Sequence, residues 1–163
     1  MKTAFILILS VLANYSFSQI QTNFDNIKLE QAADYRAADS IALGASTYLL
    51  STPFAEDNIG RLKSLSFVIR WMTGTPDYSF TLDEVAGKIV KGNDNLLGLY
   101  MAAMTKYSLE NKESSKDQKL VKLNALTSLL NYCEDVNNNV KMTKQLKKLS
   151  EAKAKGQLEQ SLK

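Results

Sequence analysis

The sequence predicts an all-α protein of five to six mostly antiparallel helices, arranged as a bundle or as stacked helical hairpins. Two observations support this fold class. Apolar residues recur at spacings of three and four in several segments, which places them on one face of a helix. No segment shows the strict alternation of apolar and polar residues that is typical of a strand. The connections between the segments are short, and short connections favour antiparallel neighbours.

The first 18 residues have the pattern of a secretory signal peptide. Lys2 is followed by a nearly continuous apolar run over residues 4–13, and Ser16-Phe17-Ser18 supplies small residues before a cleavage site. The run is much shorter than the roughly 20 residues of a membrane-spanning helix. We expect export, cleavage before Gln19, and a soluble periplasmic or extracellular product. A lipoprotein would need a cysteine directly after the signal, and the only cysteine is Cys133.

The exported chain is long enough for one domain. About 145 residues remain after cleavage, a length that is typical of a single domain. Residues 19–33 show no sustained period and are expected to be a loosely ordered lead-in. Residues 34–156 form the helical domain, and residues 157–163 a frayed tail.

The first predicted helix begins at Asp34. Apolar side chains recur on one face of it as far as Leu49. It should end near Ser51, because Pro53 disfavours the helical conformation at Thr52.

The second predicted helix begins within residues 52–58 and is apolar around much of its circumference. Its main apolar face comprises Leu62, Leu65, Ile69 and Met72, flanked by Phe67, Val68 and Trp71. A helix of this kind is normally contacted on more than one side. We therefore expect it to be the centre of the fold.

Glycine and proline predict where this helix ends. Gly74 suits a left-handed C-terminal residue, and Pro76 cannot extend a helix. Thr81 and Glu84 have the spacing of a capping box, which predicts the start of a short helix that ends at Gly92.

The next predicted helix is capped by Asn93 or Asp94. Gly98 and Ala102 lie one turn apart in it, and small residues at that spacing allow another helix to approach closely. The face that contains Trp71 is the expected neighbour.

Two more helices complete the predicted fold. Ser115 and Gln118 have the spacing of a second capping box, and the helix that they open ends at the Asn-rich segment 135–139. The last helix spans residues 140–155, is amphipathic, and ends at Gly156.

The composition excludes several chemistries. The chain has no histidine and one cysteine, so it lacks the commonest general base and zinc ligand, and it cannot form a disulfide within the chain. Cys133 is expected to be buried, with an exposed thiol that pairs between chains as the alternative. The net charge of +3 is too small to predict nucleic-acid binding.

No metal or cofactor is predicted. Residues 135–139 begin like an EF-hand calcium loop, but Val140 and Leu146 stand where that loop needs glycine and glutamate. An Asn-rich turn between helices is the better interpretation.

Aromatic and acidic residues around the second helix form one candidate ligand-binding site. Core packing is the favoured role of the aromatic residues, whereas Asp77 and Tyr78 lie on a loop where a carboxylate and a phenol could face solvent together. The candidate residues are Trp71, Thr75, Asp77, Tyr78, Asp94 and Tyr100.

The C-terminal part of the chain is strongly basic. Residues 136–163 carry a net charge of about +5, and the last helix presents most of it. An ordinary solvated face is one explanation, and a surface for an anionic envelope component or an acidic partner is the other. The lysines of this basic face are Lys141, Lys144, Lys147, Lys148, Lys153 and Lys155.

Three segments resemble small exported helical proteins of Bacteroidota whose function is unassigned. They are Ser51-Thr52-Pro53-Phe54, Arg70-Trp71-Met72-Thr73-Gly74-Thr75-Pro76-Asp77-Tyr78 and Lys91-Gly92-Asn93-Asp94, together with a signal that ends Ser-Phe-Ser before Gln. The resemblance implies export into a Gram-negative envelope and an all-helical fold, and it supplies no catalytic residues.

A non-enzymatic binding or interaction module of the bacterial envelope is therefore the leading functional hypothesis, with an unidentified protein, small ligand or anionic surface as partner. The second hypothesis is a small hydrolase or lyase that uses a carboxylate and a tyrosine, and the third is a structural or stress-related envelope protein. A concave cluster of Asp77, Tyr78 and Asp94 would favour the enzyme.

Overall fold

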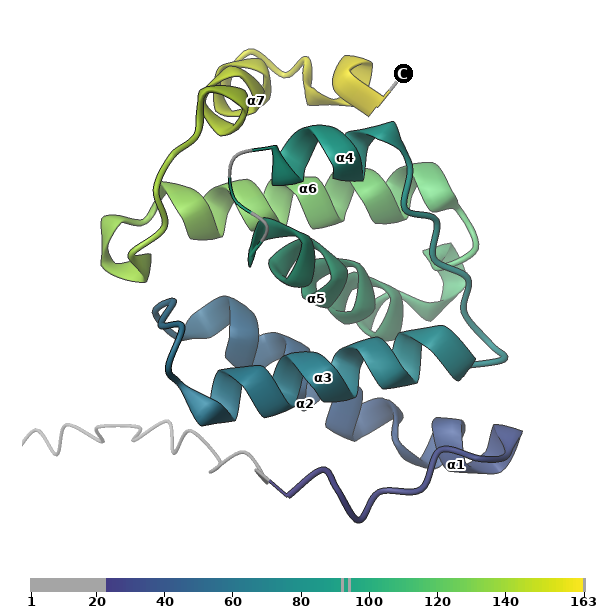
Figure 1. The fold of residues 1–163 in the computed structure, drawn as a ribbon. Coiled ribbons are helices and arrows are strands. Elements are labelled where there is room, and N and C mark those ends of the chain that lie inside the picture. Colours follow the sequence, from purple (N-terminus) through teal and green to yellow (C-terminus); the bar gives the residue numbers. More distant parts are fainter. Residues whose placement is uncertain (1–22, 92, 94, 163) are drawn as a thin grey trace, which may run out of the picture.

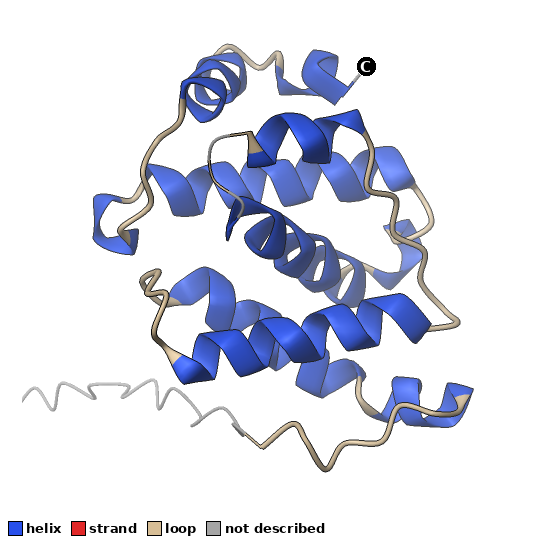
Figure 2. Cartoon of the chain, viewed as in Figure 1, coloured by secondary structure: helices blue, strands red, loops and turns tan. Residues whose placement is uncertain are grey.

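The computed structural model describes residues 23–91, 93 and 95–162. The predicted signal peptide, Gly92 and Asp94 lie outside these residues. In the described part of the chain all regular structure is helical, and loops connect the helices (Figure 2). The predicted all-α fold class is confirmed.

Seven α-helices and three short 3₁₀ helices occur in the described residues. The α-helices are α1 (Ala32–Ala37), α2 (Asp39–Ser51), α3 (Ile59–Gly74), α4 (Glu84–Val90), α5 (Asn95–Glu110), α6 (Gln118–Glu134) and α7 (Lys144–Ala154), and the 3₁₀ helices are η1 (Lys112–Ser114), η2 (Val136–Asn138) and η3 (Leu158–Leu162). The predicted number was five to six. The additional helix arises because the first predicted helix is interrupted at Ala38, which separates α1 from α2.

The helices stack as two antiparallel pairs with a cover of shorter elements. Figure 1 shows α2 and α3 as one pair and α5 and α6 as the other, with α5 in the middle of the molecule. Helix α4 lies beside α6, and α7 with η3 covers the end opposite α1. Helix α5 contacts α2, α3, α4 and α6.

Helix α5 is the centre of the core. Nine of its residues are buried, including the small residues Ala102 and Ala103. A Cβ atom at Gly98 would lie 2.7 Å from Leu65 Cδ2, so glycine is needed for the close contact with α3. The predicted close approach is therefore confirmed at Gly98, but its neighbour is Leu65 and not Trp71.

The prediction that α3 is central, with Leu62 and Ile69 on its core face, is wrong. Leu62 is 55% exposed and Ile69 is 39% exposed. The face that points into the core carries Phe67, Val68 and Trp71. These residues include the larger side chains, and their burial removes more apolar surface from water than burial of the opposite face would.

Two of the predicted helix caps are also wrong. Asp83 caps α4 by accepting a hydrogen bond from Val85 N at 3.0 Å, and Asp117 caps α6 by accepting from the backbone N–H groups of its first turn. Thr81 and Ser115, the predicted capping residues, lie too early in the chain. A carboxylate next to the first turn both accepts hydrogen bonds and complements the helix dipole.

Helix α3 does not end at a left-handed glycine. Helix α3 includes Gly74 and ends at Thr75, and Gly156 is the only described glycine with a positive φ, of 67°. At Gly74 a Cβ atom would lie 1.9 Å from the hydroxyl oxygen of Tyr35. That hydroxyl donates a hydrogen bond to Leu29 O at 3.0 Å, so glycine leaves room for the Tyr35 ring.

The segments on either side of the predicted domain pack against it. Phe24 is 3% exposed and stacks on Phe67, with 4.8 Å between ring centroids. Leu158 in η3 is buried, and η3 contacts α6 and α7. Where the structure describes them, the predicted lead-in and tail thus each contribute an apolar side chain to the core.

Two glycine substitutions should have opposite effects. Alanine in place of glycine within a helix normally stabilises a protein by about 0.5–1 kcal/mol, and Gly44 in α2 has open space at the Cβ position. We expect Gly44→Ala to raise the free energy of unfolding by that amount, and Gly74→Ala to lower it because the Tyr35 ring must move. Urea denaturation of the chain from residue 19 measures both, and stabilisation by Gly74→Ala would contradict the packing argument.

Candidate functional site

Trp71 is the anchor of the core and not the wall of a groove. Its side chain is fully buried, and Nε1 donates a hydrogen bond to Tyr35 O at 3.2 Å. Its ring centroid lies 5.4 Å from that of Tyr78 and 6.1 Å from that of Phe80. The core-packing role of this aromatic group is confirmed.

Tyr100 is likewise inaccessible to a ligand. It is 1% exposed, and its hydroxyl has no hydrogen-bond partner among the described residues. Burial raises the pKa of Tyr100 well above that of a free phenol, because the phenolate would have to be desolvated. Its side chain fills space between helices.

The loop at residues 75–78 is held by an ion pair. Arg36 Nε lies 2.7 Å from Asp77 Oδ2, and Arg36 Nη2 lies 3.0 Å from Asp77 Oδ1. The hydrogen bonds from Arg36 lower the pKa of Asp77, and burial raises the pKa of Tyr78. Both pKa values move away from neutrality, so neither group is prepared to exchange protons there. Thr75 caps α3 beside them, and Asp94 lies outside the described residues.

Other charged residues, which the sequence does not predict to be there, also lie at this loop. Lys112 Nζ lies 3.9 Å from Asp39 Oδ2, at the start of α2. Burial raises the pKa of Asp39, although Lys112 opposes the shift. Arg36, Asp39 and Lys112 come from segments far from residues 75–78 in the chain, so no local pattern reveals that they meet.

Removal of the Trp71 side chain should strongly destabilise the protein. Replacing a large buried aromatic residue by alanine typically costs about 3–5 kcal/mol, so we expect a loss of this size for Trp71→Ala. Chemical denaturation followed by far-UV circular dichroism measures the loss. A cost below about 1 kcal/mol would contradict the central position of Trp71.

A strongly basic cavity lies between α4 and α7. Its volume is about 640 Å³, and the C-terminal segment that includes η3 closes one side of it. We call it the lysine cleft, after the four lysines that line it: Lys88, Lys91, Lys148 and Lys155. Glu151 is the only acidic residue among the described residues that line it.

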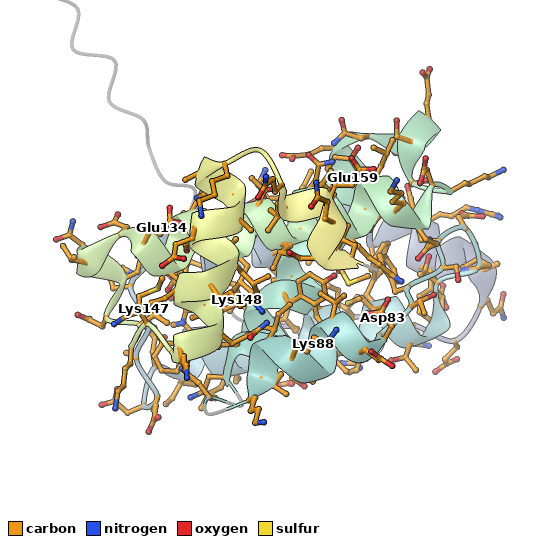
Figure 3. All side chains as sticks on the ribbon, turned by 90° about the horizontal axis from the view of Figure 1, so that it is seen from above. Asp83, Lys88, Glu134, Lys147, Lys148 and Glu159 are labelled. Carbon is orange, nitrogen blue, oxygen red and sulfur yellow. The ribbon has the colours of Figure 1, made fainter. Side chains whose placement is uncertain are left out.

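The lysine cleft divides the predicted basic face. Lys148 and Lys155 line it, whereas Lys153 forms an ion pair with Glu134 at 2.5 Å. In Figure 3, Lys148 lies on the side of α7 that faces α4, and Lys147 lies on the opposite side of α7.

The remaining residues of the basic face do not line the cleft. Lys144 and Lys147 are exposed, and Lys141 lines a separate cavity near Phe54. Lys88 and Lys91 belong to the cleft although the sequence analysis did not select them. Helix α4 precedes the basic region by about 50 residues, and only the packing of α4 against α7 brings the two together.

Buried contacts fix the two walls of the lysine cleft. Helix α4 inserts Val85, Ala86 and Ile89 into the core, and α7 inserts Leu146 and Leu149. Polar residues of both helices therefore line the cavity.

Ion pairs link α4 and η3 to α6. Asp83, at the start of α4, pairs with Lys122, and Lys119 pairs with Glu159 of η3. Figure 3 shows Asp83 at the end of α4, beyond Lys88.

Asp83 should make part of the stability dependent on pH. Burial opposes its ionisation, but the Lys122 ammonium and the Val85 amide outweigh burial, and the net effect lowers the pKa of Asp83. A lowered native pKa contributes stability that is complete above the unfolded-state value of about 4 and is lost as the pH falls through the native value.

Asp83→Asn keeps a good N-cap and removes the ion pair. We expect it to lower the free energy of unfolding by about 0.5–1 kcal/mol at pH 7, and the difference from the unmodified chain should shrink below about pH 4. Asp83→Ala should cost about 1 kcal/mol more because the cap is lost too. Urea titrations between pH 3 and 7 measure these values, and a pH-independent difference would contradict the assignment.

Comparison of the chain with protein-family models, with curated proteins and with solved structures finds no match. Among the described residues, no group of three or more carboxylate or thiol side chains is placed to hold a metal ion. None of the described helices is both long and apolar enough to cross a membrane.

Proposed function

We propose that the protein is an exported, non-enzymatic binding module that binds phosphate-bearing anionic surfaces of the bacterial envelope through the lysine cleft. The convergence of lysines from α4 and α7 on one cavity supports this proposal most directly. Export is inferred from the signal-peptide pattern of residues 1–18. The envelope location is inferred from that pattern together with the resemblance to exported proteins of Bacteroidota.

The shape and charge of the cleft suit an anionic group. The cleft lining carries four ammonium groups, of which Lys88 pairs with Glu84 at 3.6 Å, and the carboxylate of Glu151. The like charges that remain repel one another when no anion is bound. An anion between the walls would interact with lysines on both sides. Gln145, Gln157 and Gln160 also line the cleft and supply amide N–H donors.

A dependence of binding on charge alone cannot distinguish binding in the lysine cleft from nonspecific electrostatic attraction, because the whole C-terminal region is basic. The two lysine pairs Lys88 with Lys148 and Lys144 with Lys147 allow the distinction. The first pair lines the cleft, and the second is exposed and does not line it. Replacing either pair by glutamine changes the net charge by the same amount and keeps residues that favour a helix.

The test is binding of the chain from residue 19 to vesicles that contain phosphatidylglycerol, with phosphatidylcholine vesicles as the neutral control. A lysine at an anionic surface contributes about 1 kcal/mol, so we expect Lys88→Gln/Lys148→Gln to weaken binding at least tenfold. Lys144→Gln/Lys147→Gln should weaken it less than threefold. Binding should also decrease with added salt, because exposed charges are screened over about 10 Å at 0.1 M.

Equal losses in the two double variants would show that the basic region acts as a diffuse face and would contradict a role for the cleft. Absence of binding to anionic vesicles at low salt would contradict the proposal as a whole.

A further inference from the structure

Another cavity lies between α3 and α5 and shares no lining residue with the lysine cleft. Its volume is about 330 Å³, at the lower end of the roughly 300–1,000 Å³ typical of small-molecule sites. Apolar side chains form most of its walls, among them Phe54, Leu62, Leu65 and Leu99. Arg61 also lines it, and we call it the Arg61 cavity.

Arg61 is a buried cation. Arg61 is only 4% exposed. Nη1 donates hydrogen bonds to Leu49 O at 3.0 Å, to Thr52 O at 2.8 Å and to Thr52 Oγ1 at 2.8 Å. Because these carbonyl groups belong to the end of α2, the guanidinium caps that helix at the negative end of its dipole.

Among the described residues, none forms an ion pair with Arg61. The rings of Phe54 and Tyr132 lie 5.5 Å and 5.9 Å from the guanidinium carbon, so its surroundings beyond the α2 carbonyl groups are aromatic. Glu56 lines the same cavity without pairing with Arg61. A buried charge without a counter-ion is normally avoided in proteins.

The three hydrogen bonds from Arg61 to the end of α2 all use Nη1. A guanidinium carries five N–H donors in a planar fork that matches a carboxylate. Its capping role therefore leaves donors for a ligand in the cavity that Arg61 lines.

We propose that the Arg61 cavity binds a small amphipathic carboxylate, such as a medium-chain fatty acid. The carboxylate lies against the guanidinium and supplies the missing counter-charge, with hydrogen bonds strengthened by the charges of both groups. The hydrocarbon chain lies along Leu62 and Leu65 of α3 and Leu99 of α5. This site is separate from the lysine cleft and does not depend on the function proposed for it.

Leu62 and Ile69 provide a matched pair of variants. Both lie on α3 and both are exposed, at 55% and 39%, so aspartate at either position stays in contact with water. Leu62 lines the Arg61 cavity and Ile69 does not. Leu62→Asp places a negative charge at the site and removes part of its apolar wall, whereas Ile69→Asp makes the same charge change elsewhere on the helix.

The experiment is isothermal titration of the chain from residue 19 with sodium octanoate, and with 1-hexanol as an apolar probe that lacks the carboxylate. We expect octanoate to bind at one site, Leu62→Asp to weaken binding at least tenfold, and Ile69→Asp to change it less than twofold. 1-Hexanol should bind at least tenfold more weakly than octanoate. Arg61→Met, if it folds, should lose octanoate binding and retain the affinity for 1-hexanol.

Three results would overturn the proposal. They are no octanoate binding up to 10 mM, equal weakening by Leu62→Asp and Ile69→Asp, and binding of 1-hexanol as tight as that of octanoate. If Arg61→Met does not fold, the comparison of Leu62→Asp with Ile69→Asp still decides, because neither variant removes the cap of α2.

Discussion

Helix α5 is enclosed by its neighbours over most of its surface, and this burial constrains the rest of the structure. Small residues along α5 let α3 approach to the distance at which Gly98 contacts Leu65. This arrangement determines which face of each remaining helix points into the core, because each helix must direct its largest apolar residues toward α5 or toward a helix that contacts α5. Trp71 is fully buried for this reason, and the apolar residues on the far face of α3 stay exposed.

Features that depend on neighbouring residues could be predicted from the sequence. The fold class and the end of the last helix at Gly156 follow from local periodicity and turn residues. Features that depend on distant contacts could not. The choice between the two apolar faces of α3 is decided by α2 and α5, and Gly74 is required by Tyr35, almost 40 residues away in the chain.

In the candidate sites, too, some features depend on neighbouring residues and others on distant contacts. The basic character of the C-terminal region is visible in the sequence, but which of its lysines share a cavity depends on α4, a helix whose own charge pattern is unremarkable. No local pattern in the sequence distinguishes Arg61, and its role becomes visible only when the end of α2 is placed beside it. Cys133 is buried, and burial raises its pKa to about 12, which leaves the thiol unsuited to pairing between folded chains.

The two cavities place positive charge in different environments, and this difference determines what each can select. The lysines of the cleft are exposed to solvent, so salt screens them and they distinguish ligands mainly by total charge. Arg61 is held by the carbonyl groups that end α2 and is surrounded by aromatic rings. Its charge is screened less, and its planar guanidinium selects for shape as well as charge. The Arg61 cavity is therefore the place where a specific small ligand could be distinguished from other anions.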